Sequence, residues 1–566
     1  MKRLFPTLAL AFFLVFLAMK AGAYSSVTVP IEDPVYRRID KLVAFGLIKT
    51  QMIGQRPYVR AEIARLIAEA MEHYPAFAAR FREDEKQTFE QSAKRLEEKV
   101  YVDKILKGLK ADYRDELIQQ GALEGRIPAV QGQIIDELRW DLVYLDQAPS
   151  FYPADNGFGG IEGRSRPLVQ NRGGRHFVDG VNLGVETSHW FRFGKYFSVQ
   201  GEPRFQVQVA KDDKPEENQV FVQRLSGRFT WNKLDLQIGR DSVNWGPSAE
   251  GGLGFSNNAR PLDFVKLSSV SPFRYPFLFK NFGLAQWNLI VANLGPEQRF
   301  KDSWLVAYKH SMRASPYLEI GMSQSLVLGG DGAPDLGFGS AIGEFWGVGG
   351  HDQSSSNRNL DFDIIGSIPQ LWGMQVYTQL NFEDFDRSFN VLFRDDLSFI
   401  AGVYLPRATR SGTLDLRVEY RRLSARYGRH PVFTSGMTEN LFPLGDSMGP
   451  DSQSLRATMR YDFGPHTLID FGIRYGRRSG DLYDVDYDTN GVAGRTTAVD
   501  RPTESRFRTL LGVRHVFDSH LTARFGFGWE GVKNFNFVAG DDANQWLAEA
   551  GFTYRFGPDL GIGRQP

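Results

Sequence analysis

The chain has 566 residues, with 67 Lys and Arg balanced by 67 Asp and Glu, and it contains no cysteine. The length allows more than one domain, and a formal charge of zero gives a nucleic-acid partner no electrostatic support. The lack of cysteine excludes disulfides, a thiolate metal site, a Cys nucleophile and a lipidated N-terminal Cys. The 58 glycines and 13% aromatic residues favour an all-β protein over a helical one.

Residues 1–23 have the pattern of a secretory signal peptide. Lys2 and Arg3 precede an apolar run from Leu4 to Ala18, and the A-G-A at 21–23 is a cleavage pattern. A retained anchor is the alternative, but the run is short for a spanning helix. No later stretch approaches the roughly 20 apolar residues that a transmembrane helix needs. We therefore expect an exported protein that enters a membrane, if at all, as β-strands.

Residues 24–128 are predicted to form a helical domain. Helices are expected over about 34–45, 60–72 and 83–120, because apolar residues recur there at helical spacing. Within this domain, D-P-V-Y-R-R-I-D-K-L-V-A-F-G-L-I and R-P-Y-V-R-A-E-I-A-R-L-I resemble a single surface-layer-homology repeat at about 33–70. Such modules bind cell-wall polymers as multiples, so one copy favours a packing role over wall binding.

Residues 129–566 alternate between apolar and polar side chains, and a period of two predicts β-strands. A soluble β-sandwich or propeller is the alternative interpretation. Against it, the polar face repeatedly carries Arg, Glu and Asp, while Tyr, Trp and Phe rim the apolar face, as in an outer-membrane barrel. The clearest example is a strand in which Leu521, Ala523, Phe525, Phe527 and Trp529 alternate with Thr522, Arg524, Gly526, Gly528 and Glu530.

The spacing of the predicted strands supports an antiparallel barrel of about 18 strands. Tight links alternate with the long links 147–176, 243–260, 329–357, 426–451 and 479–503, as expected for periplasmic turns and external loops. The long link 271–280 breaks this alternation. An even count places both barrel ends, and the helical domain, in the periplasm. The predicted strands are 135–146, 177–190, 195–210, 217–231, 233–242, 261–270, 281–293, 302–312, 316–328, 358–367, 370–384, 394–406, 411–425, 452–463, 466–478, 504–518, 520–535 and 544–556.

Two motifs suggest chemistry only weakly. Ser447 lies in a G-x-S-x-G pattern, but this copy sits in a long loop rather than between a strand and a helix, as a nucleophile elbow requires. Asp484, Asp486 and Asp488 begin a sequence like a calcium loop, yet Thr489 and Arg495 occupy the places of its glycine and glutamate. We expect no catalytic residue and no cofactor, and keep the three aspartates only as a weak calcium candidate.

The link between the fifth and sixth predicted strands does not alternate and is rich in glycine. It reads G-R-D-S-V-N-W-G-P-S-A-E-G-G-L-G-F-S-N-N-A-R-P over residues 239–261. Glycine lets a backbone approach a ligand closely, Trp offers a flat apolar face, and Arg and Asn offer directional donors. Such a loop suits a sugar ring, and a structural loop packed by its tryptophan is the alternative. The candidate residues, for polysaccharide binding or for plugging the lumen, are Arg240, Trp245, Ser256, Asn257, Asn258 and Arg260.

This stretch resembles the central signature of the Wzi family of capsule assembly proteins, in G-R-x-x-x-x-W-G-P and then S-x-N-A-R-P. The resemblance implies an 18-stranded outer-membrane barrel, plugged on its periplasmic side by helices, which attaches capsular polysaccharide as a lectin rather than an enzyme. The surface-layer-homology-like segment 33–70 departs from the best-known members. Gly246, Pro247 and Pro261 are also signature positions.

Three functions follow as hypotheses. The first is a sealed outer-membrane barrel that attaches or organises capsular or exopolysaccharide, in contact with outer-membrane lipid. The second is a porin for carbohydrates or general solutes, with the helical domain tethered to the wall. The third is a surface hydrolase that uses Ser447. Peptidoglycan and the periplasmic export machinery are further candidate partners of the helical domain.

Overall fold

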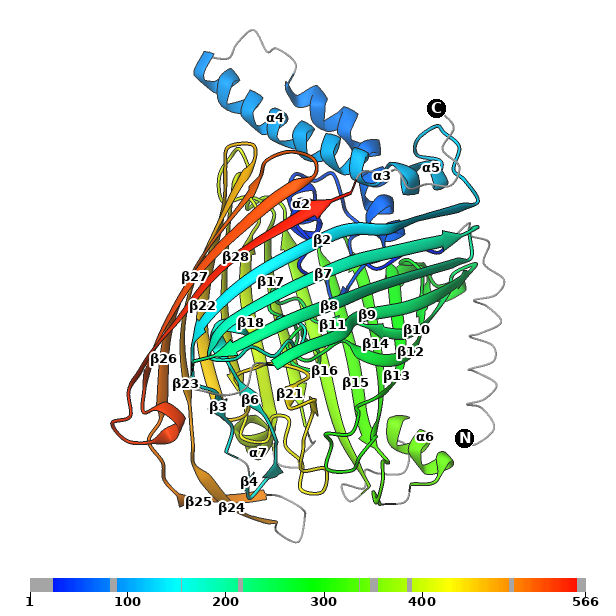
Figure 1. The fold of residues 1–566 in the computed structure, drawn as a ribbon. Coiled ribbons are helices and arrows are strands. Elements are labelled where there is room, and N and C mark those ends of the chain that lie inside the picture. The colour runs from blue at the N-terminus through cyan, green and yellow to red at the C-terminus, as the bar shows by residue number, and fades with distance from the viewer. Residues whose placement is uncertain are drawn as a thin grey trace.

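The computed structural model describes residues 24–81, 89–153, 155–211, 217–334, 336–346, 355–383, 389–487 and 493–556. These residues form one large barrel with a group of helices at one end (Figure 1). The expected signal peptide, residues 1–23, and the calcium candidate Asp488 lie outside the described residues.

Within the described residues, 18 strands pair in a closed antiparallel ring. Each barrel strand pairs with the next one along the chain, and β2 closes the ring by pairing with β28 as well as β7. Every strand predicted from the period of two overlaps one of these, so the predicted barrel is confirmed. The barrel strands are β2 (Val130–Asp146), β7 (Gly180–Phe193), β8 (Phe197–Ala210), β9 (Glu217–Trp231), β10 (Leu234–Asp241), β12 (Leu262–Ser269), β13 (Leu284–Asn293), β14 (Trp304–Ser315), β15 (Leu318–Leu328), β16 (Ser356–Ile368), β17 (Met374–Phe382), β18 (Leu397–Leu405), β19 (Leu414–Leu423), β22 (Ser452–Phe463), β23 (Thr467–Arg478), β26 (Glu504–Val516), β27 (Leu521–Lys533) and β28 (Ala543–Arg555).

Burial in the barrel is the reverse of that in a soluble protein. Phe205 and Phe527 point outward and are 46% and 49% exposed, whereas Glu186 and Arg204 point inward and are 1% and 2% exposed. Charged residues are seldom buried without partners, and large apolar residues seldom cover a whole outer surface in water. The apolar outer face is therefore the lipid-facing side of a membrane-spanning barrel. Closure also leaves no sheet edge whose backbone groups would be unpaired in lipid.

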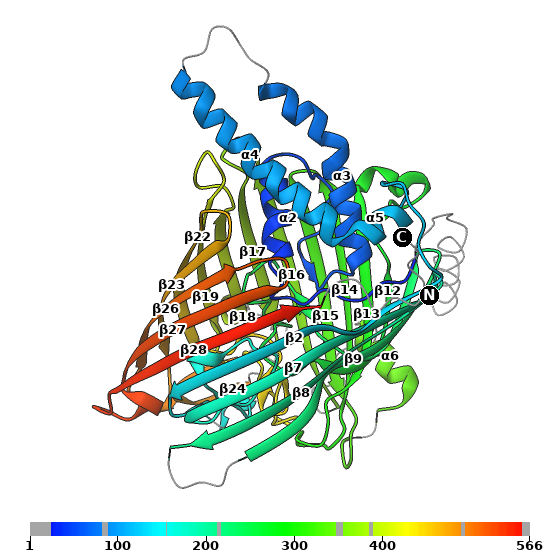
Figure 2. The same ribbon diagram turned by 45° about the horizontal axis from the view of Figure 1, so that its top comes forward.

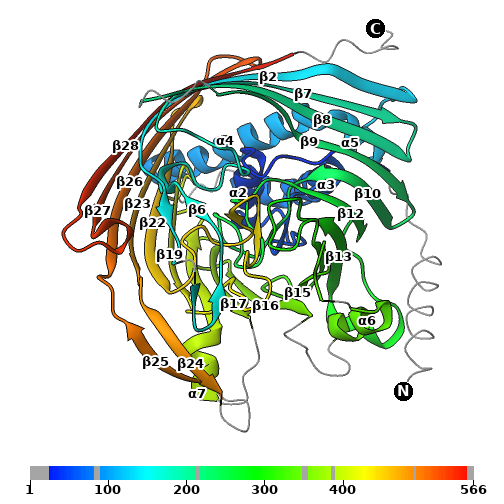
Figure 3. The ribbon, with the colours of Figure 1, turned by 60° about the horizontal axis from the view of Figure 1, so that its bottom comes forward.

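The two rims of the barrel differ in the length of their connections. On the rim that we call the turn side, residues 194–196, 232–233 and 464–466 are tight turns, and 270–283 is the one long exception that the sequence predicted. The other rim, the loop side, carries the long connections, and parts of them lie within the ring of strands (Figure 3). The N-terminal helices sit on the turn side (Figure 2).

The N-terminal helices are α2 (Val35–Ala44), α3 (Arg60–Ala78), the short η1 (Ala79–Phe81), α4 (Phe89–Asp112) and α5 (Arg114–Gln119). Ile39, Leu42, Ile63 and Ile67 are completely buried between them, which confirms the apolar stripes read from the sequence. Among the residues that the structure describes, no helix is both long and apolar enough to cross a bilayer.

The single long helix predicted over 83–120 is wrong. The described part of this region is two helices, because α4 ends at Asp112 and α5 begins at Arg114. Tyr113 between them has a non-helical φ of −119°. Its buried ring lies under the guanidinium of Arg60, 4.4 Å from the ring centre, so tertiary packing of this aromatic residue interrupts the helix.

Short helices and short strand pairs lie in the connections at both ends of the barrel. The loop-side connections contain β3 (Ser150–Phe151) with β6 (Arg164–Ser165), β4 (Asp155–Asn156) with β5 (Gly159–Gly160), η2 (Pro167–Val169), α6 (Phe338–Trp346), α7 (Phe389–Val391), η4 (Leu392–Asp396), β20 (Thr438–Glu439) with β21 (Phe442–Pro443), β24 (Leu482–Tyr487) with β25 (Ala493–Val499), and η5 (Phe535–Phe537). On the turn side lies η3 (Phe277–Phe282). One further pair, β1 (Gln55–Arg56) with β11 (Asn244–Trp245), joins the two ends and is described below.

Candidate functional site

The signature loop, residues 242–261 between β10 and β12, folds into the lumen. Trp245 is only 2% exposed and packs edge-on against Phe255, with ring centres 4.8 Å apart. The Trp245 backbone N–H also donates to the Phe255 carbonyl at 3.2 Å. A Cβ on Gly252 would lie 1.6 Å from the Trp245 carbonyl oxygen, so only glycine allows the two backbones to come this close. The glycines of the signature thus make a compact loop around its tryptophan.

A second loop-side connection, residues 424–451, holds the signature loop from the outside. The Ser256 hydroxyl donates to the Gly445 carbonyl at 2.6 Å, and the Asn258 side chain donates to the Pro443 carbonyl at 3.0 Å. Arg260 makes an ion pair of 2.6 Å with Glu439, whose side chain is 1% exposed. Because each contact uses a buried or half-buried polar group, the two loops form one hydrogen-bonded unit.

The N-terminal domain reaches the same loop from the turn side. Gln55 and Arg56 of β1 pair with Trp245 and Asn244 of β11 as an antiparallel two-stranded sheet. The Gly246 N–H donates to the Gly54 carbonyl at 2.9 Å, next to this sheet. The lumen therefore contains backbone hydrogen bonds between a segment that enters from one rim and a loop that enters from the other.

The barrel wall in turn anchors the incoming N-terminal segment. The buried Glu319 carboxylate of β15 accepts from the backbone N–H groups of Ile53 and Gly54, each at 2.8 Å. Four and five strands farther around the ring, Arg37 of α2 makes ion pairs of 2.7 Å with Asp415 of β19 and with Asp462 of β22. These contacts fasten the helical domain to strands on different parts of the ring.

All six residues predicted for the site contact other parts of the chain, and five of them lie inside the plug. Arg240 is instead on β10, where it pairs with Asp263 of β12 at 2.7 Å. Asn257 is buried and donates to Glu32 of the N-terminal segment and to the Asn171 carbonyl, the latter at 3.3 Å. The structure therefore brings Trp245, Ser256, Asn257, Asn258 and Arg260 together and leaves Arg240 on the wall.

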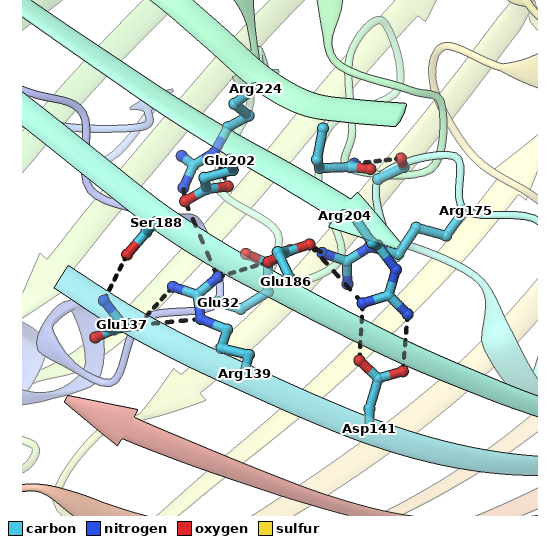
Figure 4. Close-up of polar contacts among 12 residues, drawn as sticks. Glu32, Glu137, Arg139, Asp141, Arg175, Glu186, Ser188, Glu202, Arg204 and Arg224 are labelled. Atoms are coloured by element: carbon cyan, nitrogen blue, oxygen red, sulfur yellow. Dashed lines mark hydrogen bonds and ion pairs between the residues drawn. The ribbon is translucent and has the colours of Figure 1, made fainter. Parts of the chain in front are cut away.

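The wall formed by β2, β7, β8 and β9 carries a network of inward ion pairs (Figure 4). Arg139 pairs with Glu137 at 2.7 Å and with Glu186 at 3.0 Å. Arg175 comes from the loop-side connection 147–179 and also pairs with Glu186, at 2.6 Å. This third loop is therefore fixed to the wall as well, and the inward charges of these strands are matched by each other rather than by water.

The neighbouring part of the wall, from β19 to β27, is separated from β2 only by β28 and is rich in arginine. Glu250, the one acidic residue in the signature loop between residues 242 and 261, points at this wall and makes ion pairs with Arg456 at 2.8 Å and with Arg474. A cavity of about 1510 Å³ lies along this wall and is lined at one end by Glu250, Arg456 and Arg508. Glu250 was missed as a site residue, although a lone carboxylate in a glycine-rich loop is a signal that the sequence contains.

The weaker motifs lie elsewhere. Ser447 is buried and donates to the Gln170 side chain at 2.7 Å rather than to a histidine, and the described residues of its loop, 424–451, contain no helix. Asp484 and Asp486 lie on β24 of the β24–β25 hairpin. Among the described residues, no group of three His, Cys, Asp or Glu side chains is placed to hold a metal ion.

Comparison with known proteins agrees with this architecture. The family model of the capsule assembly protein Wzi matches residues 162–547. Among solved structures, Wzi of Escherichia coli, described as a carbohydrate-binding β-barrel involved in group 1 capsule assembly, is 14% identical. The match covers 94% of this chain and 99% of that one, with a TM-score of 0.63.

More distant barrels include an OccD1 (OprD) variant, 10% identical over 76% of this chain and 97% of that one, with a TM-score of 0.41. Acinetobacter baumannii OccAB4 is 11% identical over 75% of this chain and 98% of that one, also with a TM-score of 0.41. A search of curated proteins gives no sequence match. Because the family model spans residues 162–547, well over half of the chain, the chain belongs to the Wzi capsule assembly protein family.

Proposed function

We propose that this outer-membrane barrel attaches or organises capsular or other extracellular polysaccharide at the cell surface by lectin-like binding on its loop side. The observation that carries the proposal is the combination of family membership with a lumen occupied by interlocked loops. A barrel filled in this way presents a shaped outer surface instead of a free channel. Carbohydrate binding by the Escherichia coli barrel of the same fold supports this assignment.

The lengths of the connections support one orientation in the membrane. In outer-membrane barrels the short turns are periplasmic and the long loops are external. The helical domain, residues 24–128, then lies in the periplasm after removal of residues 1–23, and residues 129–566 form the barrel. The exposed face of α4 is where peptidoglycan or a component of the export machinery would contact the domain.

The signature residues act in this proposal as the plug and not as the sugar-binding surface. Trp245, Asn257 and Asn258 are buried, and their polar groups already bind other segments. Polysaccharide would instead contact exposed side chains of the loops that the plug supports. Glu162 and Arg164, in the connection 147–179, are exposed on this side, and an arginine can bind a sugar carboxylate with two hydrogen bonds.

Deletion of the gene and one matched pair of variants test this function. Deletion should release polymer into the medium while total polymer synthesis stays unchanged. Arg164→Glu should weaken retention of the host's own polysaccharide by cells, whereas Arg410→Glu, at an exposed residue of the turn side, should not. Normal retention by the deletion strain would contradict the proposal.

A porin is the second candidate, favoured by the cavity of about 1510 Å³ beside the plug. Planar-bilayer recordings separate the two functions. A plugged barrel should show no steady conductance, whereas a porin should give stable single-channel steps that sugars block. For the hydrolase hypothesis, Ser447→Ala should leave every phenotype intact, because the Ser447 hydroxyl is buried against Gln170.

A further inference from the structure

Three arginines of adjacent strands lie directly opposite one another on the inner wall. In the strand register, Arg456 of β22 is the partner of Arg474 of β23, and Arg474 is the partner of Arg508 of β26. Glu419 and Glu530 are the next partners in this row, one at each end. Like charges placed directly opposite in a sheet repel each other, so this row is stable only with anions beside it.

The carboxylates around the arginine row do not fully neutralise its positive charge. Among the described residues, two adjoining sets of ion pairs around the row join six arginines to five carboxylates. The arginines are Arg421, Arg456, Arg474, Arg478, Arg506 and Arg508, and the carboxylates are Glu250, Glu419, Asp446, Glu504 and Glu530. Within these two sets the arginines exceed the carboxylates by one, in a place that is largely removed from water.

Arg474, at the centre of the row, also has unused donors. Its side chain is 6% exposed, and its Nη2 group donates to Glu250. Its Nε and Nη1 atoms are buried and have no hydrogen-bond partner within the described part of the chain. A small cavity of about 20 Å³ lies against Arg474, Arg508 and Gln170, which is room for about one water-sized group. A buried guanidinium with unsatisfied N–H groups is a binding site for an oxyanion.

A ligand can reach this place from the turn side. The large cavity is lined by Lys104 and Lys107 of α4 and by the turn residues Gly464 and His466 at one end, and by Glu250, Arg456 and Arg508 at the other. Arg474 lines the adjoining small cavity, which shares Arg508 and Gln170 with the large one. Glu250 belongs to the signature loop and not to the wall. Its carboxylate occupies the place that a free carboxylate or phosphate would take on Arg456 and Arg474.

We propose that the arginine row Arg456–Arg474–Arg508 is an oxyanion-binding site, at the inner end of a cavity that faces the turn side. It would take a small carboxylate or phosphate group, such as that of an acidic sugar, in competition with Glu250. The site lies in the lumen, apart from the external loops to which the surface function is assigned.

Calorimetric titration of the purified full-length barrel in detergent tests this site, with sodium glucuronate, inorganic phosphate and neutral glucose as probes. Glucuronate or phosphate should bind, and glucose should not. Arg474→Gln should weaken binding by roughly tenfold or more, because a hydrogen bond to a charged group is lost. Glu250→Gln, of nearly the same shape, should strengthen binding because it removes the competing charge.

Two controls keep the result specific. Arg514→Gln changes an arginine of the same cavity and of the same strand as Arg508, nearer the turns, and should leave the affinity unchanged. Arg164→Glu on the loop side should also leave it unchanged, so a failure of the surface proposal and a failure of this one are distinguishable. Circular dichroism of each variant establishes that the barrel is folded.

The relative affinity identifies the source of the anion. Tighter binding of glucuronate supports an acidic sugar, and tighter binding of phosphate supports a phosphorylated ligand. If neither anion binds the wild type or Glu250→Gln, or if Arg474→Gln binds as tightly as the wild type, the proposal is overturned.

Discussion

Gln55 and Trp245 face each other in a two-stranded sheet inside the lumen, although one comes from the N-terminal domain and the other from a loop of the opposite rim. The Gly54 carbonyl next to this pair accepts from the Gly246 N–H at 2.9 Å. The two halves of the plug therefore stabilise each other directly. Damage to either half should loosen the other, and this follows from the backbone pairing alone.

Trp245→Ala should loosen the plug. The side chain is 2% exposed, and truncation of a buried aromatic residue typically costs about 3–5 kcal/mol. Most of this cost should fall on the docking of the signature loop, so we expect protease cleavage within 242–261 and a conductance absent from the wild type. Trp546→Ala is the matched control, because that tryptophan lies on the lipid-facing side and is 41% exposed. If Trp245→Ala left both protease cleavage and conductance as in the wild type, the packing role of the tryptophan would be contradicted.

Gly252→Ala should also loosen the plug, although this change removes no side chain. The added Cβ would lie 1.6 Å from the Trp245 carbonyl oxygen, a distance that the backbone can relieve only by moving. Gly227→Ala on β9 adds the same atom where nothing lies within 4 Å, and it should be tolerated. Limited proteolysis and bilayer conductance of the two variants give the comparison. Equal behaviour of the two would mean that the loop is not closely packed.

Val418→Arg tests the lipid-facing assignment of the outer wall. Val418 is 47% exposed, and in a soluble protein an arginine at such a position would be nearly neutral. In a bilayer the same change should cost roughly 2–4 kcal/mol near the midplane. The free energy of unfolding measured in lipid vesicles, with Val418→Leu as the control, distinguishes these outcomes. A neutral Val418→Arg would place this strand outside the hydrocarbon region.

The docking of the helical domain should strengthen with rising pH through Lys41 of α2. Burial lowers the pKa of Lys41 to about 8, against the opposing effect of Asp415. The lysine therefore costs folding free energy in full below about pH 8. This cost falls as pH rises toward 10.5, because the folded state has lost a proton that the unfolded state still binds.

The slope of the free energy of unfolding against pH in this window is at most roughly 1.4 kcal/mol per unit from one group. Lys41→Met should remove this contribution, so the difference between wild type and variant isolates it from other titrations. Denaturant unfolding at several pH values between 8 and 10.5 measures both slopes. Identical slopes would show that Lys41 is not buried in a charge-disfavouring site.

Much of this architecture could be predicted from the chain alone. A strand between lipid and a wet lumen alternates apolar and polar side chains, as Phe525, Phe527 and Trp529 alternate with Arg524 and Glu530. Each strand shows this local pattern by itself. The number of strands and the unequal links follow from the same pattern. Tyr113 shows what such local patterns cannot predict. The apolar spacing predicts one continuous helix there, but the packing of the Tyr113 ring against Arg60 interrupts it.

The chain by itself therefore determined the barrel, its lipid-facing side and the unusual nature of the loop at 239–261, because these depend on neighbours one or two residues apart. Only the tertiary structure decided that Trp245 meets Gln55, that Asn258 and Arg260 bind the loop 424–451, and that Glu250 enters the row of Arg456, Arg474 and Arg508. Those contacts join residues far apart along the sequence. They depend on closure of the ring, which brings the loops 242–261 and 424–451 and the N-terminal segment into one lumen.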